Sequence, residues 1–269
     1  MQRNIMNSEF VKLGNLISPK PEGIDYDLEV GRIYKLKYIR GWDSHIELVC
    51  DGTIDLPEKV YYSEAERNFI NKITNYYNKY TPNTLGVMLH GKQGCGKTLF
   101  AKNIAINLNL PIIVVDPSFS SKMLTNYFTK FKTPVCIMFD ELDKHLDDEW
   151  DSEEMLEFLD GVQTTCKKVV LFTCNDDEDV TKFMKNRCGR IRYYRNFKEL
   201  DDSMIREIVS DVIENKDNID KVCENIKKYI ELPSYDIITS VMKDINDYPD
   251  SDFLDIIADL NINVKKTDD

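Results

Sequence analysis

The sequence predicts an α/β fold with a five-stranded parallel sheet, a small β-rich N-terminal module and a C-terminal helical lid. Between residues 85 and 194, short continuous apolar runs alternate with helical stretches, which is typical of a parallel sheet covered on both faces. After Leu200 the pattern is helical to the end. We therefore expect three domains. They are a β-rich module over residues 1–60, an α/β core over 61–199 and an acidic helical lid over 200–269.

The N-terminal elements follow from alternation and capping signals. Apolar residues alternate with lysines over 34–38, and a second short strand is expected over 46–48. Ser63 and Glu66 form a capping pattern that begins a helix, and Pro82 ends it. The five strands expected after this helix are residues 85–90, 112–115, 135–139, 169–173 and 190–194.

Composition excludes several classes of protein. The 269 residues are 42% hydrophobic and 30% charged, and no apolar run is long enough for a membrane helix. The N-terminal residues lack a secretory signal, and the seven scattered cysteines and three isolated histidines fit neither a disulfide framework nor a zinc site. We expect a soluble, cytoplasmic protein that does not enter a membrane.

The net charge of −12 is concentrated in one segment. Residues 199–269 contain 19 acidic and 8 basic residues, a net charge of −11. This segment repels a phosphate backbone, so any nucleic acid would have to bind elsewhere.

A phosphate-binding loop is the strongest motif. Residues 91–98, GKQGCGKT, fit the pattern GxxxxGK[ST] between a predicted strand and a predicted helix. The glycines let successive N–H groups point at phosphates, Lys97 reaches the β- and γ-phosphates, and Thr98 ligates Mg²⁺. The residues expected to bind ATP here are Gly91, Gln93, Gly94, Cys95, Gly96, Lys97, Thr98 and Leu99.

Polar residues at two strand ends complete the expected site. Asp140 and Glu141 follow an apolar strand, where Asp140 suits Mg²⁺ and Glu141 can deprotonate the attacking water. Asn175 ends the next apolar strand and can hold the water or a γ-phosphate oxygen, although asparagine there is also ordinary turn chemistry. Arg187 and Arg190 are candidates to stabilise the transferring phosphate from a neighbouring subunit, or else they pair with acidic residues of their own subunit.

Taken together, residues 56–245 resemble the AAA+ ATPases, specifically the AAA subset in the narrow sense. Besides the loop and the Asp-Glu pair, MLEFLDGV at 155–162 is similar to the family's LLxxLDG helix, and NRCGRIRY at 186–193 is similar to its arginine-finger segment. The composition and NRCGRIRY also resemble AAA ATPases of bacterial viruses, which would place the protein in the host cytoplasm.

The resemblance implies a homo-oligomer, a hexameric ring with ATP at each subunit boundary. Arg187 and Arg190 would then serve the neighbour's ATP, with Asp160 and Gly161 in the region that senses it. Backbone groups near Tyr61 would read the adenine edge.

The sequence also departs from the family pattern. The stretch after Val115 lacks the aromatic-hydrophobic-glycine loop of protein-threading members, and Phe119 is the nearest substitute unless it simply packs in the core. No basic residue of the lid is identified as a second sensor.

Three functions are compatible with these features. The favoured one is an ATPase that remodels a protein partner recognised by residues 1–60. The second is a nucleic-acid processing or loading ATPase, supported only by the basic, aromatic residues 32–40 and Trp42, which otherwise form an ordinary amphipathic strand pair. The third is an ATP-dependent assembly scaffold.

Overall fold

The computed structural model describes most of the chain. The described residues are 10–13, 15–19, 27–40, 45–57, 59–80, 84–116, 119–144, 157–160, 166–175, 191–197 and 200–265. The strands are β1 Phe10–Leu13, β2 Leu16–Pro19, β3 Arg32–Ile39, β4 His45–Thr53, β5 Thr84–His90, β6 Ile112–Val114, β7 Val135–Phe139, β8 Lys168–Cys174 and β9 Ile191–Asn196. The helices are α1 Glu64–Lys79, α2 Lys97–Asn107, α3 Ser121–Phe128, α6 Asp202–Val212, α7 Ile219–Tyr229, α8 Tyr235–Asp247 and α9 Phe253–Asp259, with 3-10 turns η1 Leu142–Lys144 and η2 Lys216–Asn218.

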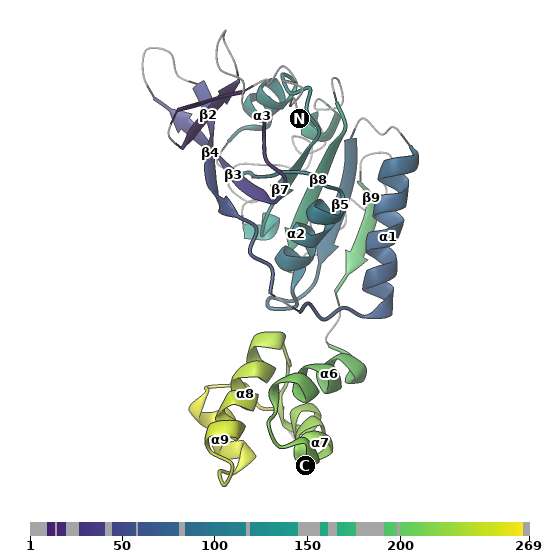
Figure 1. Cartoon of the computed structure of the whole chain (residues 1–269), viewed down its shortest axis with the longest axis vertical. Coiled ribbons are helices and arrows are strands. Elements are labelled where there is room, and N and C mark those ends of the chain that lie inside the picture. The colour runs from purple at the N-terminus through teal and green to yellow at the C-terminus, as the bar shows by residue number, and fades with distance from the viewer. Residues whose placement is uncertain are drawn as a thin grey trace, which may run out of the picture. The chain divides into compact units, whose positions relative to one another are not determined.

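The expected five parallel strands lie side by side in one sheet. They lie in the order β6-β7-β8-β5-β9, and each pairs with its neighbours in parallel. Strands β7 and β8 are buried along their whole length, which explains their continuous apolar sequences. Figure 1 shows α2 lying across this part of the sheet and α1 beside β9. The predicted α/β class is therefore confirmed.

The sheet is larger than the five strands expected. The N-terminal strands add to its β6 edge, giving nine strands in the order β1-β2-β4-β3-β6-β7-β8-β5-β9. Strand β3 runs parallel to β6, with Ile33 opposite Ile112 and Lys35 opposite Val114, and antiparallel to β4. Sequence periodicity predicts these strands but not their partner, because the pairing joins segments nearly 80 positions apart.

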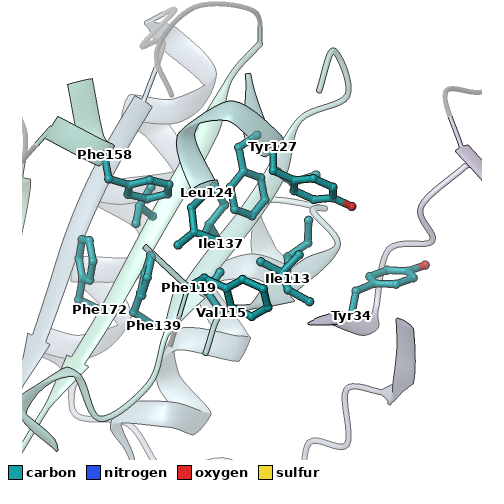
Figure 2. Packing of buried hydrophobic residues seen from close by; sticks show 14 of the residues in the cluster. Tyr34, Ile113, Val115, Phe119, Leu124, Tyr127, Ile137, Phe139, Phe158 and Phe172 are labelled. Atoms are coloured by element: carbon teal, nitrogen blue, oxygen red, sulfur yellow. The ribbon is translucent and has the colours of Figure 1, made fainter. Parts of the chain in front are cut away.

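Aromatic residues fill the core beside the sheet. Phe139 of β7 stacks on Phe172 of β8 with ring centroids 5.3 Å apart, and Phe158 meets Phe139 edge-on at 5.5 Å (Figure 2). Such aromatic pairs add about 0.5–1.5 kcal/mol each beyond their burial. Phe158 and Leu159 are both buried, so the short helical segment 157–160 is anchored to the strands that lead to the candidate site.

Contacts divide the chain into two compact units. The first contains residues 1–56, 69–91 and 97–196, and the second contains 57–68, 92–96 and 197–269. The second unit is a helical bundle of α6–α9 with its own apolar core, which includes Ile208, Ile226, Ile238, Val241 and Ile257. Its helices begin at side-chain caps such as Asp201 and Ser234. No described helix is both long and apolar enough to cross a membrane.

Candidate active site

The loop between β5 and α2 has the backbone that phosphate binding requires. Gly91, Gly94 and Gly96 have φ values of 148°, 81° and 85°, and a side chain is strained in this region of φ. The amide of Gly91 donates to the carbonyl of Cys174, which ties the start of the loop to the end of β8. The loop leads directly into the N-terminus of α2, where free N–H groups and the helix dipole favour anions.

Lys97, the first residue of α2, is held against the start of this loop. Its side chain is buried, and its Nζ donates to the carbonyl oxygen of Gly91 at 2.6 Å. A buried amine nitrogen needs a hydrogen-bond partner to offset its lost hydration. The geometry therefore places the Lys97 side chain against the start of the phosphate loop, where a lysine can contact the oxygens of a polyphosphate.

Thr98 and Asp140 come together although 42 positions separate them. The Thr98 hydroxyl donates to Asp140 Oδ1 at 2.8 Å. A hydroxyl beside a carboxylate, next to a phosphate-binding loop, is an oxygen donor set of the kind that Mg²⁺ uses together with waters and substrate phosphates. The residues present therefore fit a magnesium ion.

A buried threonine, which the sequence did not single out, organises both acidic residues. The Thr173 hydroxyl donates to Asp140 Oδ1 at 2.5 Å and accepts from the Glu141 amide at 2.8 Å. Thr173 has no exposed surface. A hydroxyl so deep in the sheet needs partners, and here the partners are the candidate metal ligand and the backbone of the candidate base.

Glu141 has an unusual backbone conformation. Its φ is +52°, in the left-handed region that costs a residue with a side chain about 1–2 kcal/mol. The hydrogen bond from its amide to Thr173 holds this conformation in place. Left-handed residues of this kind cluster at active sites, where strain fixes the direction of a side chain.

Asn175 is held by a second residue that the sequence analysis missed. Asp143, in the turn η1, accepts from the Asn175 amide at 2.9 Å through Oδ1 and from its Nδ2 at 3.3 Å through Oδ2. The orientation of the Asn175 side chain is thereby set from the β7 side of the sheet. The only sequence signal for Asp143 is an acid two positions after Glu141.

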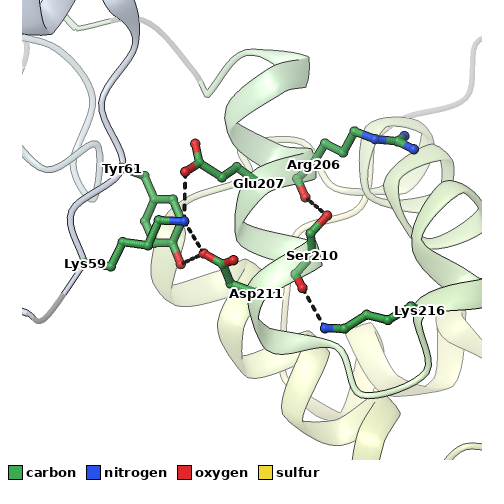
Figure 3. Close-up of polar contacts among 7 residues, drawn as sticks. All are labelled: Lys59, Tyr61, Arg206, Glu207, Ser210, Asp211 and Lys216. Carbon is green, nitrogen blue, oxygen red and sulfur yellow. Dashed lines mark hydrogen bonds and ion pairs between the residues drawn. The ribbon is translucent and has the colours of Figure 1, made fainter.

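Tyr61 lies in a segment that is tied to α6 of the helical unit. Its hydroxyl donates to Asp211 Oδ2 at 2.8 Å, and Lys59 contacts the same oxygen as well as Glu207 (Figure 3). The ring of Tyr61 lies 5.5 Å from that of Tyr235, between centroids. Burial, followed by the hydrogen bond to Asp211, raises the pKa of Tyr61 to about 12, so the phenol stays protonated at neutral pH. The contact of this segment with an adenine stays a prediction.

The remaining predicted residues either pack in the core, lie outside the described residues or keep a role that is only predicted. Phe119 is buried in the core with Val115 and Leu124, which supports simple packing for it. Arg187 and Arg190 lie outside the described residues, as does Gly161. Gln93, Cys95 and Leu99 lie within the described residues, and their contact with ATP stays a prediction.

The fold and the site define a P-loop nucleoside triphosphatase. Residues 87–196 match the family model named "ATPase family associated with various cellular activities (AAA)". The matched residues include most of the phosphate loop's flanking strand, the loop itself and the Asp140–Glu141 pair, so this part of the chain is similar to the AAA ATPases.

Comparisons with individual proteins agree with this assignment. A putative cell division cycle ATPase of Plasmodium falciparum (isolate 3D7) is 29% identical over 124 residues. The alignment covers 46% of this chain but only 9% of that relative. A solved structure of katanin, reported for katanin self-assembly, superposes with a TM-score of 0.51 and 17% identity, covering 72% of this chain and 71% of that one. At this identity the katanin structure supports the fold alone.

Proposed function

We propose that this protein is a magnesium-dependent ATP hydrolase that works as an oligomeric ring and remodels a protein partner. The observation that supports the chemistry best is the contact of Thr98 with Asp140, next to Lys97 and its hydrogen bond to Gly91. Residues 61–199 would perform the reaction, and the acidic segment 200–269 would serve as the lid. Magnesium, when bound, would neutralise charge on the β- and γ-phosphates.

The chain's own residues divide the work of hydrolysis. Lys97 and the loop amides bind and orient the phosphates, while Thr98 and Asp140 provide the oxygens for the cation. Glu141 accepts a proton from the attacking water, and Asn175 positions that water or a γ-phosphate oxygen. Through its two hydrogen bonds, the Thr173 hydroxyl fixes the Asp140 carboxylate relative to the Glu141 backbone.

The oligomeric part of the proposal comes from the family. Arg187 and Arg190 would complete the ATP site of a neighbouring subunit, so that hydrolysis in one subunit depends on the next. Residues 1–60 would recognise the partner, and a hexamer in the cytoplasm, that of a host cell if the protein is viral, is the expected form. Self-assembly of katanin, which shares the fold, is consistent with a ring.

The experiment that tests this function uses Glu141→Gln. The variant should bind ATP but not hydrolyse it, because glutamine cannot accept the proton. Light scattering at near-physiological salt should then show small species without nucleotide and about six subunits with ATP and Mg²⁺. Retained turnover would remove Glu141 from the role of base.

Two controls separate the enzyme from its assembly. Arg187→Ala should abolish turnover while mixtures with Glu141→Gln regain part of it, which requires shared sites. A protein that assembles and disassembles with hydrolysis, without stimulation by any partner, would instead be a scaffold.

A further inference from the structure

A long acid-free segment contrasts with the acidic composition of the chain. The protein contains 47 acidic and 35 basic residues, yet residues 67–115 contain no aspartate or glutamate. Strand β9 has none either, and it contributes Arg192 and Arg195. Residues 67–79 of α1 and strand β9 therefore carry basic residues and no acidic ones, whereas the first turn of α1 carries Glu64 and Glu66.

The fold brings these two segments together. Strand β9 ends the sheet, and α1 lies next to it in Figure 1. Tyr76 of α1 meets Tyr193 of β9 edge-on, with ring centroids 5.8 Å apart. We call the resulting area the α1–β9 surface, and its defining residues are Lys72, Tyr76, Lys79, Tyr80, Arg192 and Arg195.

The cations of this surface lie over aromatic rings. The guanidinium carbon of Arg192 is 4.0 Å from the centre of the Tyr76 ring, and the Nζ of Lys79 is 5.4 Å from that of Tyr80. The ion pairs found within the described part of the chain lie elsewhere, such as Lys35 with Asp51. A cation stacked on a ring keeps its N–H donors available and is restrained in position, so it binds an anion at a lower entropic cost.

The character of the surface distinguishes between possible anionic partners. Tyr80 is 49% exposed, and its ring centroid lies 4.8 Å from that of Tyr76. Among the described residues of this surface, Tyr80 is the one large hydrophobic side chain that is exposed. The exposed positions in the second half of α1 otherwise carry lysines and the amides of Asn71, Asn75 and Asn78, and the acidic Glu64 lies at the start of the helix. The centre of a protein–protein interface is apolar and depleted of lysine, whereas nucleic-acid interfaces are polar and strongly positive. Exposed tyrosine flanked by cations is also typical of surfaces that bind single strands.

We propose that the α1–β9 surface binds single-stranded nucleic acid. Lys72, Lys79, Arg192 and Arg195 contact phosphates, and Tyr80 stacks on a base. This function is independent of ATP hydrolysis, since none of these residues belongs to the candidate active site.

The test measures fluorescence polarisation of labelled oligothymidine and oligouridine of about 16 nucleotides with the full chain. Four phosphate contacts predict a slope of log affinity against log salt of about −3, hence roughly 50-fold weaker binding at about 200 mM than at about 50 mM salt. Lys72→Ala and Lys79→Ala should each reduce the slope by about 0.7. Tyr80→Ala should weaken binding at least about five-fold, and Tyr80→Phe should restore it.

Controls make each outcome decisive. Lys37→Ala removes an exposed lysine from β3 and should leave binding unchanged, and turnover of ATP by Tyr80→Ala should match that of the parent. The proposal is overturned if neither oligonucleotide binds at low salt, or if Lys37→Ala lowers the slope as much as Lys72→Ala. It is also overturned if a glutamate-rich peptide binds this surface more tightly than either oligonucleotide, since the ligand would then be an acidic protein.

Discussion

Replacing Thr173 with valine tests the organisation of the active site. Valine has the same shape, so the substitution removes only the hydroxyl and with it two hydrogen bonds, one to the Asp140 carboxylate and one from the Glu141 amide. A bond to a charged group contributes about 1.5–3 kcal/mol and a neutral one about 0.5–1.5 kcal/mol, so unfolding should become easier by about 2–4 kcal/mol. The Glu141 amide would also lose its acceptor while its φ remains strained.

The catalytic effect should exceed what lost stability explains. Without Thr173, the Asp140 carboxylate and the Glu141 backbone are no longer fixed relative to one another. We expect kcat to fall by about 10- to 100-fold, as for small displacements of catalytic groups. The concentration of Mg²⁺ for half-maximal activity should rise, with little change in KM for ATP. Steady-state ATPase assays with a Mg²⁺ titration and urea unfolding measure both effects.

A matched substitution is available in the same sheet. The Thr84 hydroxyl at the start of β5 is buried and has no hydrogen-bond partner among the described residues. Thr84→Val should therefore leave activity unchanged and keep or raise stability. If Thr173→Val showed parental kcat and a parental free energy of unfolding, the positioning role of Thr173 would be refuted.

Three other predictions concern separate parts of the structure. Gly94→Ala places a side chain at φ +81°, which costs about 1–2 kcal/mol within the phosphate loop, so binding of a fluorescent ATP analogue should weaken. The control is Gly31→Ala, at φ +80° with open space around it. This control should lower the thermal midpoint but not ATP binding. Asp143→Ala should lower kcat by about ten-fold with ATP binding retained. Because Asp143 holds Asn175, Asn175→Ala should lower kcat less in the Asp143→Ala background than in the parent. Full additivity of the two effects in this double-mutant cycle would contradict their coupling. The hydrogen bond from Lys59 lowers the pKa of Asp211. The Asp211 carboxylate therefore contributes to stability above about pH 4, and this contribution is lost as pH falls through the lowered pKa. The thermal midpoints of the parent and Asp211→Asn should differ at neutral pH and converge in acid.

The sequence predicts those parts of the site whose chemistry is encoded locally. The phosphate loop is a contiguous motif, and Asp140 and Glu141 follow a strand that is apolar throughout, so their place at the end of the sheet could be inferred. Thr173 could not be identified in this way, because threonine is an ordinary strand residue and its role depends on two acids from another strand.

Tertiary contacts explain the remaining differences. The attachment of the Tyr61 segment to α6 depends on Asp211, which is 150 positions away. The positive φ of Glu141 has no sequence signal, since glutamate rarely adopts it. Likewise, the alternation in β3 predicts a strand with one buried face, but nothing in that alternation identifies β6 as its neighbour.

The pairing of β3 with β6 has a consequence during synthesis of the chain. A ribosome adding about 5–20 residues per second completes the β3–β4 hairpin roughly 3–12 seconds before β6 emerges. Throughout that interval β3 exposes a row of unpaired N–H and C=O groups, to which strands of other nascent chains can add. Slower translation of residues 54–114 would lengthen this exposure, so the yield of folded protein should depend on the speed at which this segment is made.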